Sequence, residues 1–68
     1  MTPIDLKRLR DAAGLSRKEV AEHLNVTERA IYNYEKGIRH INLEQVLILS
    51  DLFECSAREI IEAQLNSR

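Results

Sequence analysis

The 68-residue sequence is poor in residues that break helices or cross-link chains, with one proline, two glycines and one cysteine. A single cysteine cannot form a disulfide within the chain, so the fold has to rest on packing, helped at most by a partner subunit. No apolar run approaches the roughly 18 residues of a membrane span, and the longest, residues 46–49, ends at Ser50 and Asp51. Basic side chains at positions 7, 8 and 10 interrupt the segment where a signal peptide needs its apolar core. We therefore expect a soluble, cytoplasmic protein.

Neither sign of charge is in large excess, since the net charge is −1. The two parts of the chain differ: residues 1–40 hold eight basic and six acidic side chains, whereas residues 41–68 hold two basic and five acidic ones. A negatively charged partner would therefore meet the first part. The length allows one small domain, residues 1–68, and the composition of 44% hydrophobic and 31% charged residues is typical of a globular one.

Signals for helices are dense, whereas almost nothing alternates with the period of a β-strand. Three segments match the capping box, in which two side chains satisfy backbone N–H groups at a helix start: residues 16–19, 42–45 and 56–59. Thr27 offers a further cap, and Thr2 is expected to cap a helix whose first position is Pro3. These signals predict an all-α, compact five-helix domain with helices at residues 3–13, 17–24, 28–36, 43–53 and 57–65.

The link between the second and third expected helices is very short. Asn25 tolerates the left-handed conformation, and the apolar residues on either side of it, Leu24 and Val26, have to point inward. Such a link forces a sharp crossing and predicts a helix-turn-helix, in which the small Ala21 permits close approach. The angle between the two helices would be filled by Val20, Leu24, Val26, Ile31 and Tyr34. The spacing alone leaves a helical hairpin without a role in DNA binding as an equal alternative.

One face of the expected third helix carries most of its long polar side chains. With about 100° per residue, Ala30, Ile31 and Tyr34 share the packing face. The opposite arc is expected to face DNA bases and comprises Glu28, Arg29, Tyr32 and Asn33. Arginine and asparagine pair bidentately with guanine and adenine, and tyrosine can touch a thymine methyl or a phosphate. Glutamate can accept from a cytosine amino group or orient a neighbouring side chain. The alternative is an ordinary solvated face.

Groups suited to phosphate binding lie on both sides of this helix. Backbone N–H groups at the start of a helix favour an anion, and lysine or arginine beside them adds a full positive charge. The expected phosphate contacts are Arg17, Lys18, Thr27, Lys36, Arg39 and His40. Each basic side chain taken singly is more often a solvated charge, but their placement around one helix favours the phosphate interpretation.

Together these features resemble the phage repressor/Cro-type helix-turn-helix family, the xenobiotic-response-element-like regulators of bacteria and phages. The resemblance covers residues 6–61 and is carried by Leu6-Lys7-Arg8-Leu9-Arg10, Gly14-Leu15-Ser16, Glu19-Val20-Ala21, Leu24-Asn25-Val26-Thr27, Ile31, Tyr34-Glu35-Lys36-Gly37, Leu43-Glu44 through Phe53, and Ser56 to Ile60. It implies a lambda-repressor-like domain whose third helix enters the major groove, and a transcriptional repressor that binds a palindromic operator as a dimer. It also implies an ion pair between Arg10 and Glu35.

Apolar residues in the last two expected helices predict a homodimer. The core face of the helix at 43–53 is expected to comprise Leu43, Val46, Leu47, Ser50 and Phe53. Ile48 and Leu52 then form a second stripe that needs cover, and Ile61 and Leu65 form an outward ridge on the last helix. The alternative is that the helix at 43–53 is buried on all sides.

No enzyme, metal or cofactor is expected. His23, His40 and Cys55 lack the paired spacing of a structural zinc site, and so small a domain has little room for a catalytic pocket. Cys55 is interpreted as a small buried hydrophobe. The expected partners are double-stranded DNA and a second copy of the chain, and no membrane. The alternative function is a protein-binding module, such as an antitoxin or an adaptor.

Overall fold

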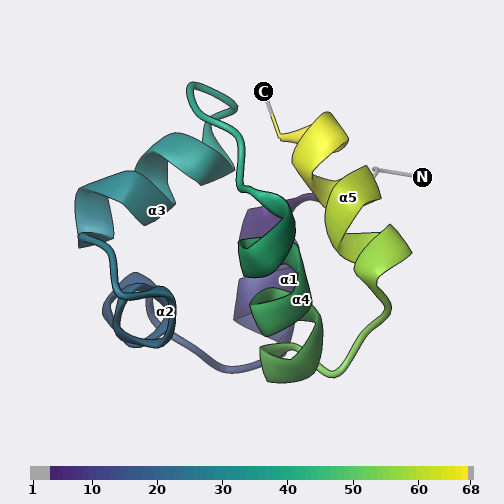
Figure 1. The fold of residues 1–68 in the computed structure, drawn as a ribbon, viewed down its shortest axis with the longest axis horizontal. Helices are drawn as coiled ribbons and strands as arrows, with labels where there is room; N and C mark the ends of the chain where they lie inside the picture. Colours follow the sequence, from purple (N-terminus) through teal and green to yellow (C-terminus); the bar gives the residue numbers. More distant parts are fainter. Residues whose placement is uncertain (1–3, 68) are drawn as a thin grey trace.

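The computed structural model describes residues 4–67, which form five α-helices and no strand. The helices are α1 (Leu6–Ala12), α2 (Arg17–Leu24), α3 (Glu28–Glu35), α4 (Leu43–Leu52) and α5 (Ala57–Asn66). In Figure 1, α2 and α3 lie at the left and α5 at the right, and α1 and α4 overlap between them. The prediction of an all-α domain of five helices is confirmed. The longest described helices have ten residues, about half of what a bilayer span requires, and none of them is suited to cross a membrane.

Side-chain caps fix where most of these helices begin. The predicted boxes Ser16–Glu19 and Asn42–Gln45 are complete, with both reciprocal bonds formed in each. The Thr27 hydroxyl accepts from the backbone N–H of Ala30 at 3.1 Å, as expected of a cap. At the start of α5, only the Ser56 hydroxyl takes part, accepting from the Glu59 N–H at 3.1 Å.

The start of α1 differs from the prediction. The helix begins after Asp5, whose carboxylate accepts from the backbone N–H of Arg8 at 2.9 Å, and Ile4 lies outside the helix. The predicted helix start at residue 3 is therefore wrong. Asp5 is itself a strong N-cap, so the helix begins at Leu6. The expected roles of Thr2 and Pro3 lie outside the described residues.

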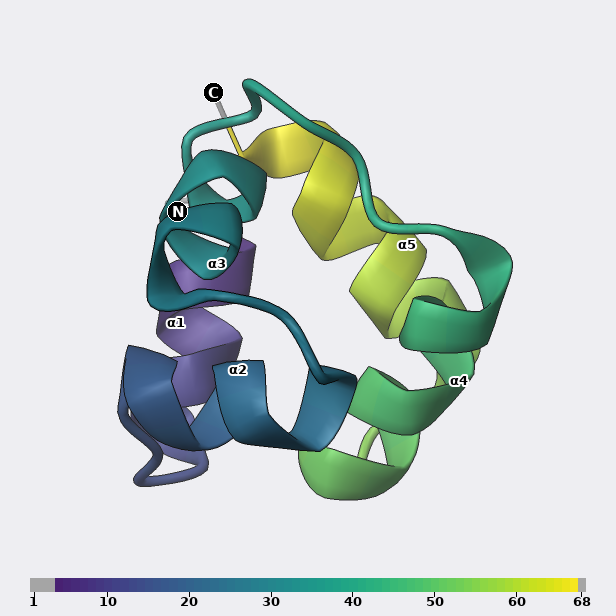
Figure 2. The same cartoon turned by 60° about the vertical axis from the view of Figure 1, so that its left-hand side comes forward.

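The turn between α2 and α3 has the geometry that its sequence predicts. Asn25 adopts the left-handed conformation, with φ 57° and ψ 45°, and the N–H of Val26 donates to the carbonyl of Ala21 at 3.0 Å. Figure 2 shows the resulting crossing of α2 beneath α3. The angle between them opens onto the core, which consists of Leu6, Val20, Ala21, Leu24, Ile31, Tyr34, Val46, Leu49, Ile60 and Ala63. Residues 17–35 therefore form a helix-turn-helix.

Helix α4 is rotated relative to the prediction. Leu43 and Leu47, expected in the core, are 73% and 56% exposed, whereas Leu49 is 3% exposed. Ile48 and Leu52, expected as an outward stripe, pack against the core. Four consecutive apolar residues at 46–49 leave the helix without a distinct polar side, so periodicity could not set its phase.

Amide side chains hold α4 and α5 against the rest of the domain. The Gln45 amide donates to the Tyr34 hydroxyl at 3.2 Å, which turns the adjoining side of α4 toward the core. The buried Gln64 of α5 donates to the backbone carbonyl of Tyr34 at 3.2 Å and accepts from the N–H of Ile41 at 3.0 Å. The Tyr34 region, at the end of α3, is thus a shared attachment point for α4 and α5.

The beginning and the end of the described chain are bonded together. The buried Ser67 hydroxyl accepts from the N–H of Leu6 at 3.2 Å and donates to the carbonyl of Ala63 at 2.8 Å. The Asn66 amide donates to the carbonyl of Ile4 at 3.1 Å. These bonds join α1 to α5 on the side of the molecule remote from α2 (Figure 1).

The phase of α4 can be tested by a matched pair of truncations. We expect Leu49→Ala to lower the free energy of unfolding by about 3 kcal/mol, because it leaves a cavity in the core. We expect Leu47→Ala, which removes the same atoms on the exposed side of α4, to lower the free energy of unfolding by less than about 0.5 kcal/mol. Urea titration followed by circular dichroism measures both. A larger loss for Leu47→Ala than for Leu49→Ala would show that α4 has the phase expected from sequence, and equal losses would show that both of its sides are buried.

Candidate nucleic-acid interface

The outward face of α3 is built on a packed inner face. Ile31 and Tyr34 are buried in the core and hold the helix in a fixed rotation about its axis. On the opposite side, Arg29 is exposed, and Tyr32 and Asn33 are half-buried. The structure therefore presents the expected base-facing set on one surface, with Glu28 exposed at the first position of the helix.

Three cationic side chains gather around the ring of Tyr32. The Arg29 guanidinium carbon lies 4.8 Å from the ring centroid, the Arg17 carbon 5.3 Å, and the Lys36 ammonium nitrogen 5.6 Å. We call Arg17, Arg29 and Lys36, with the ring between them, the Tyr32 cluster. Arg17 belongs to α2, so the cluster combines charges of both helices of the helix-turn-helix on one surface. The sequence indicated the cations but not their common contact with one aromatic ring.

A buried carboxylate lies behind this surface. The Glu35 side chain is only 4% exposed, and its two oxygens accept separately from Arg10 Nε at 2.7 Å and Arg17 Nε at 3.0 Å. Arg10 also donates to the carbonyl of Leu15 at 2.9 Å, which leaves it well satisfied inside the domain. The Arg10–Glu35 pair implied by the family resemblance is thus present. Its second partner, Arg17, was missed, because no spacing rule relates positions 17 and 35.

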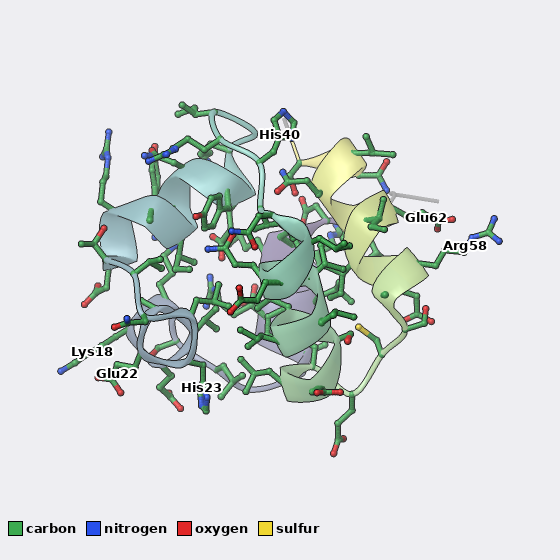
Figure 3. The ribbon with its side chains drawn as sticks, in the orientation of Figure 1. Lys18, Glu22, His23, His40, Arg58 and Glu62 are labelled. Atoms are coloured by element: carbon green, nitrogen blue, oxygen red, sulfur yellow. The ribbon has the colours of Figure 1, made fainter. Side chains whose placement is uncertain are left out.

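The remaining expected phosphate contacts lie around the two helices. Figure 3 shows Lys18 projecting from α2, while His40 lies on the loop that follows α3. Arg39 is exposed on the same loop, whose start is fastened by the Asn33 carbonyl, which accepts from the N–H groups of Ile38 and Arg39 at 3.0 and 3.3 Å. Thr27 is exposed while it caps α3. Thr27 thus lies at the start of α3, Arg39 and His40 follow its end, and Lys18 lies on α2.

The expected dimer residues separate into two groups. Ile61 and Leu65 are exposed on α5, as a ridge that faces outward. Ile48 and Leu52 pack against the core, so the predicted outward stripe is wrong. The apolar run at residues 46–49 had left the rotation of α4 undetermined. The exposed apolar side chains of α4 are Leu43 and Leu47 instead. A shallow hollow beside the ridge is lined by Ile41, Val46 and Gln64 together with Ile61 and Leu65.

Groups suited to metal binding or nucleophilic chemistry are scattered. Within residues 4–67, no three histidine, cysteine, aspartate or glutamate side chains lie close enough together to hold a metal ion. Cys55 is half-buried against the core. Burial raises the pKa of its thiol, and the negative charge and hydrogen bond of Glu59 raise it further. The reactive thiolate is therefore disfavoured.

The profile of the helix-turn-helix family matches residues 6–60, which span all of α1 to α4 and the start of α5. The chain belongs to this family, of Cro/C1 type. The resemblance inferred from the sequence motifs is confirmed.

Curated relatives carry names that agree with this assignment. HTH-type transcriptional regulatory proteins of Saccharolobus islandicus and Saccharolobus solfataricus are 46% identical to the chain over 48 residues, which is 71% of this chain and 16% of theirs. The HTH-type transcriptional regulator ImmR of Bacillus subtilis is 39% identical over 51 residues, 75% of this chain and 40% of ImmR. The chain thus matches less than half the length of these relatives. No solved structure matches it.

The energetic role of the Glu35 carboxylate can be measured by a double-mutant cycle with Arg10→Ala and Glu35→Ala. Because both side chains are almost fully buried, removing either one should lower the free energy of unfolding by about 3 kcal/mol, and the double variant should lose much less than the sum. The exposed pair Arg58–Glu62, at 3.0 Å, is the control and should couple by less than about 0.5 kcal/mol. Strict additivity at positions 10 and 35 would contradict the expectation.

Proposed function

We propose that the chain binds double-stranded DNA in a sequence-specific manner, as a homodimer on a palindromic operator, and represses transcription in the cytoplasm. The observation that carries this proposal is the two-sided construction of α3. Its inner face is fixed in the core of a helix-turn-helix, while its outer face presents a guanidinium, an amide and an aromatic ring among flanking cations. In this geometry the helix fits the major groove and its neighbours reach the two phosphate backbones.

Within this proposal the side chains of the interface have distinct tasks. Arg29 and Asn33 read bases, because each offers paired donors or a donor and an acceptor to a base edge. Tyr32 lies on the same face among the cations, and Glu28 orients a neighbour or accepts from cytosine. Phosphates are contacted by Arg17, Lys18, Thr27, Lys36, Arg39 and His40, at both ends of α3.

The dimer is supported by the exposed apolar ridge of α5. Ile61 and Leu65 lie four residues apart on one side of the helix, with Leu43 and Leu47 exposed on the neighbouring helix α4. A two-fold pairing through this ridge would place two copies of α3 about 34 Å apart, which is one turn of DNA. The repressor role is supported by the family to which the chain belongs, since a dimer bound over a promoter blocks access to it.

A protein-binding module is the second candidate. The same exposed apolar side chains, in a part of the chain that is rich in acidic residues, suit a protein surface as well as a second copy. A titration of labelled DNA at several salt concentrations separates the two functions. A linear fall of log K with log salt supports DNA binding, whereas a chain that binds no duplex at low salt supports the module.

Substitutions on α3 test the division of tasks. We expect Arg29→Ala and Asn33→Ala each to cost about 1 to 3 kcal/mol on the preferred site and to relax the preference at particular base pairs. Arg39→Ala, outside the helix, is the matched control: it should weaken all sequences alike and reduce the salt slope by about one. Selection from random duplexes followed by sequencing measures both effects. Uniform weakening by all three variants would remove the base-reading assignment.

The dimer is tested by the double variant Ile61→Asp with Leu65→Asp. Because both side chains are exposed, the helical content should remain, while tight operator binding is lost at protein concentrations where the unchanged chain is dimeric. Sedimentation equilibrium measures the association directly, and Arg58→Ala on the same helix is the control. An unchanged chain that stays monomeric at high concentration, or unchanged affinity in the double variant, would contradict the interface.

A further inference from the structure

We propose that Glu35 and Tyr32 are positioning residues that act through Arg17, presetting its guanidinium to grip one phosphate of the DNA backbone. The inference rests on the proposed DNA binding and goes further in assigning how one contact is made. It gives Tyr32 a role through a neighbouring cation, in place of the base contact expected from its position on α3.

The carboxylate fixes one edge of the guanidinium. Arg17 donates from Nε to Glu35 at 3.0 Å, and the carboxylate cannot move, because its other oxygen is held by Arg10 at 2.7 Å and the side chain is almost entirely buried. A guanidinium has five N–H donors in one plane. Fixing Nε leaves the two terminal amino groups of Arg17, which donate to no acceptor among residues 4–67. The Arg17 side chain is 36% exposed, so this pair of amino groups can reach solvent.

The aromatic ring restrains Arg17 from a second direction. The guanidinium carbon lies 5.3 Å from the ring centroid of Tyr32, within the range of a cation–π contact. The bond to Glu35 holds the Nε atom, and the ring limits rotation of the plane about that bond. Two side chains from α3 thus determine where a side chain from α2 points.

The charges of the site favour an anion in front of Arg17. Arg10 and Arg17 carry two positive charges, and Glu35 and Asp11, whose carboxylate lies 3.4 Å from Arg10, carry two negative ones. Arg29 and Lys36 add two more positive charges around the same ring, at 4.8 and 5.6 Å from its centroid. Like charges gathered around one ring repel, and a phosphate placed among them relieves the repulsion. Planar bidentate donors match a phosphate in geometry, which an ammonium group cannot do.

The geometry itself is tested in the free protein by NMR. In the unchanged chain we expect the Nε–H of Arg17 to exchange slowly and its δ protons to show a ring-current shift. Tyr32→Phe should keep that shift, and Tyr32→Leu should abolish it. Tyr32 is half-buried and outside the core, so both variants should fold, and circular dichroism checks this. A mobile Arg17 with no shift in the unchanged chain would overturn the inference without involving DNA.

The function of the arrangement is tested with a duplex of about 20 base pairs, selected by the unchanged chain from a random pool. Single neutral methylphosphonates are introduced along one half-site, and the phosphate whose neutralisation no longer matters in Arg17→Ala is assigned to Arg17. We expect Tyr32→Leu to lose about three- to tenfold in affinity and to become insensitive at that phosphate alone. Tyr32→Phe should behave as the unchanged chain does. Arg17→Lys should lose about tenfold with an unchanged salt slope, since the charge remains and the planar fork is gone.

The outcomes distinguish the inference from the proposed function. If the unchanged chain binds no duplex, the proposed function fails and the phosphate contact fails with it. If it binds, but Tyr32→Leu keeps full sensitivity at the Arg17 phosphate or changes the preferred base, Tyr32 acts by its own contact and the inference is wrong. Glu35→Gln gives a parallel arm, because an amide cannot accept at both ends from two guanidiniums. In a folded Glu35→Gln variant, retained sensitivity at that phosphate would remove Glu35 from the assignment.

Discussion

The buried carboxylate of Glu35 constrains the placement of three helices. It lies at the end of α3 and takes one guanidinium from α1 and another from α2, at 2.7 and 3.0 Å. A rotation of α3 about its axis, or a slide of α2 past it, would leave a charge buried without a partner, which costs several kcal/mol in a protein interior. The outward face of α3 is therefore set from the inside, and the side chains aimed at a partner depend on a carboxylate that is itself only 4% exposed.

Much of the fold was predictable because its signals are local. A capping box requires side chains three residues apart, and the left-handed turn at Asn25 requires a residue type that accepts it, so the sequence around residues 16 and 25 was sufficient. The signal that sets the rotation of α4 about its axis is not local. Four consecutive apolar side chains fit several rotations, and the choice among them depends on the contact of Gln45 with Tyr34, eleven residues away in sequence. The start of α1 was misplaced because Asp5 competed with an earlier cap.

The candidate site also has one part that the sequence predicts and one part that it does not. The arc of Arg29, Tyr32 and Asn33 follows from the pitch of a helix whose buried side is clear, and the structure presents it as expected. The Tyr32 cluster could not be read from spacing, because Arg17 reaches it from another helix at an angle that only the folded turn defines. Arg17 was expected only as a phosphate contact, and its bond to the core carboxylate was not foreseen. Spacing predicted relations within a helix but not between helices, and the one ion pair between helices that was expected, Arg10–Glu35, came from the family resemblance.

The hydrogen bonds from Leu6 to Ser67 and from Asn66 to Ile4 connect the two ends of the described chain. Their partners are 61 and 62 positions apart, so each contact closes nearly the longest loop that the chain contains and contributes only when the intervening helices are already in place. Fraying at either end must break the same bonds, which makes the first turn of α1 and the last turn of α5 one cooperative unit. In a circular permutant, a short peptide would link the present ends and new ends would be opened elsewhere on the surface, and every contact between helices would stay intact. The order of the helices along the chain is thus not what holds the domain together.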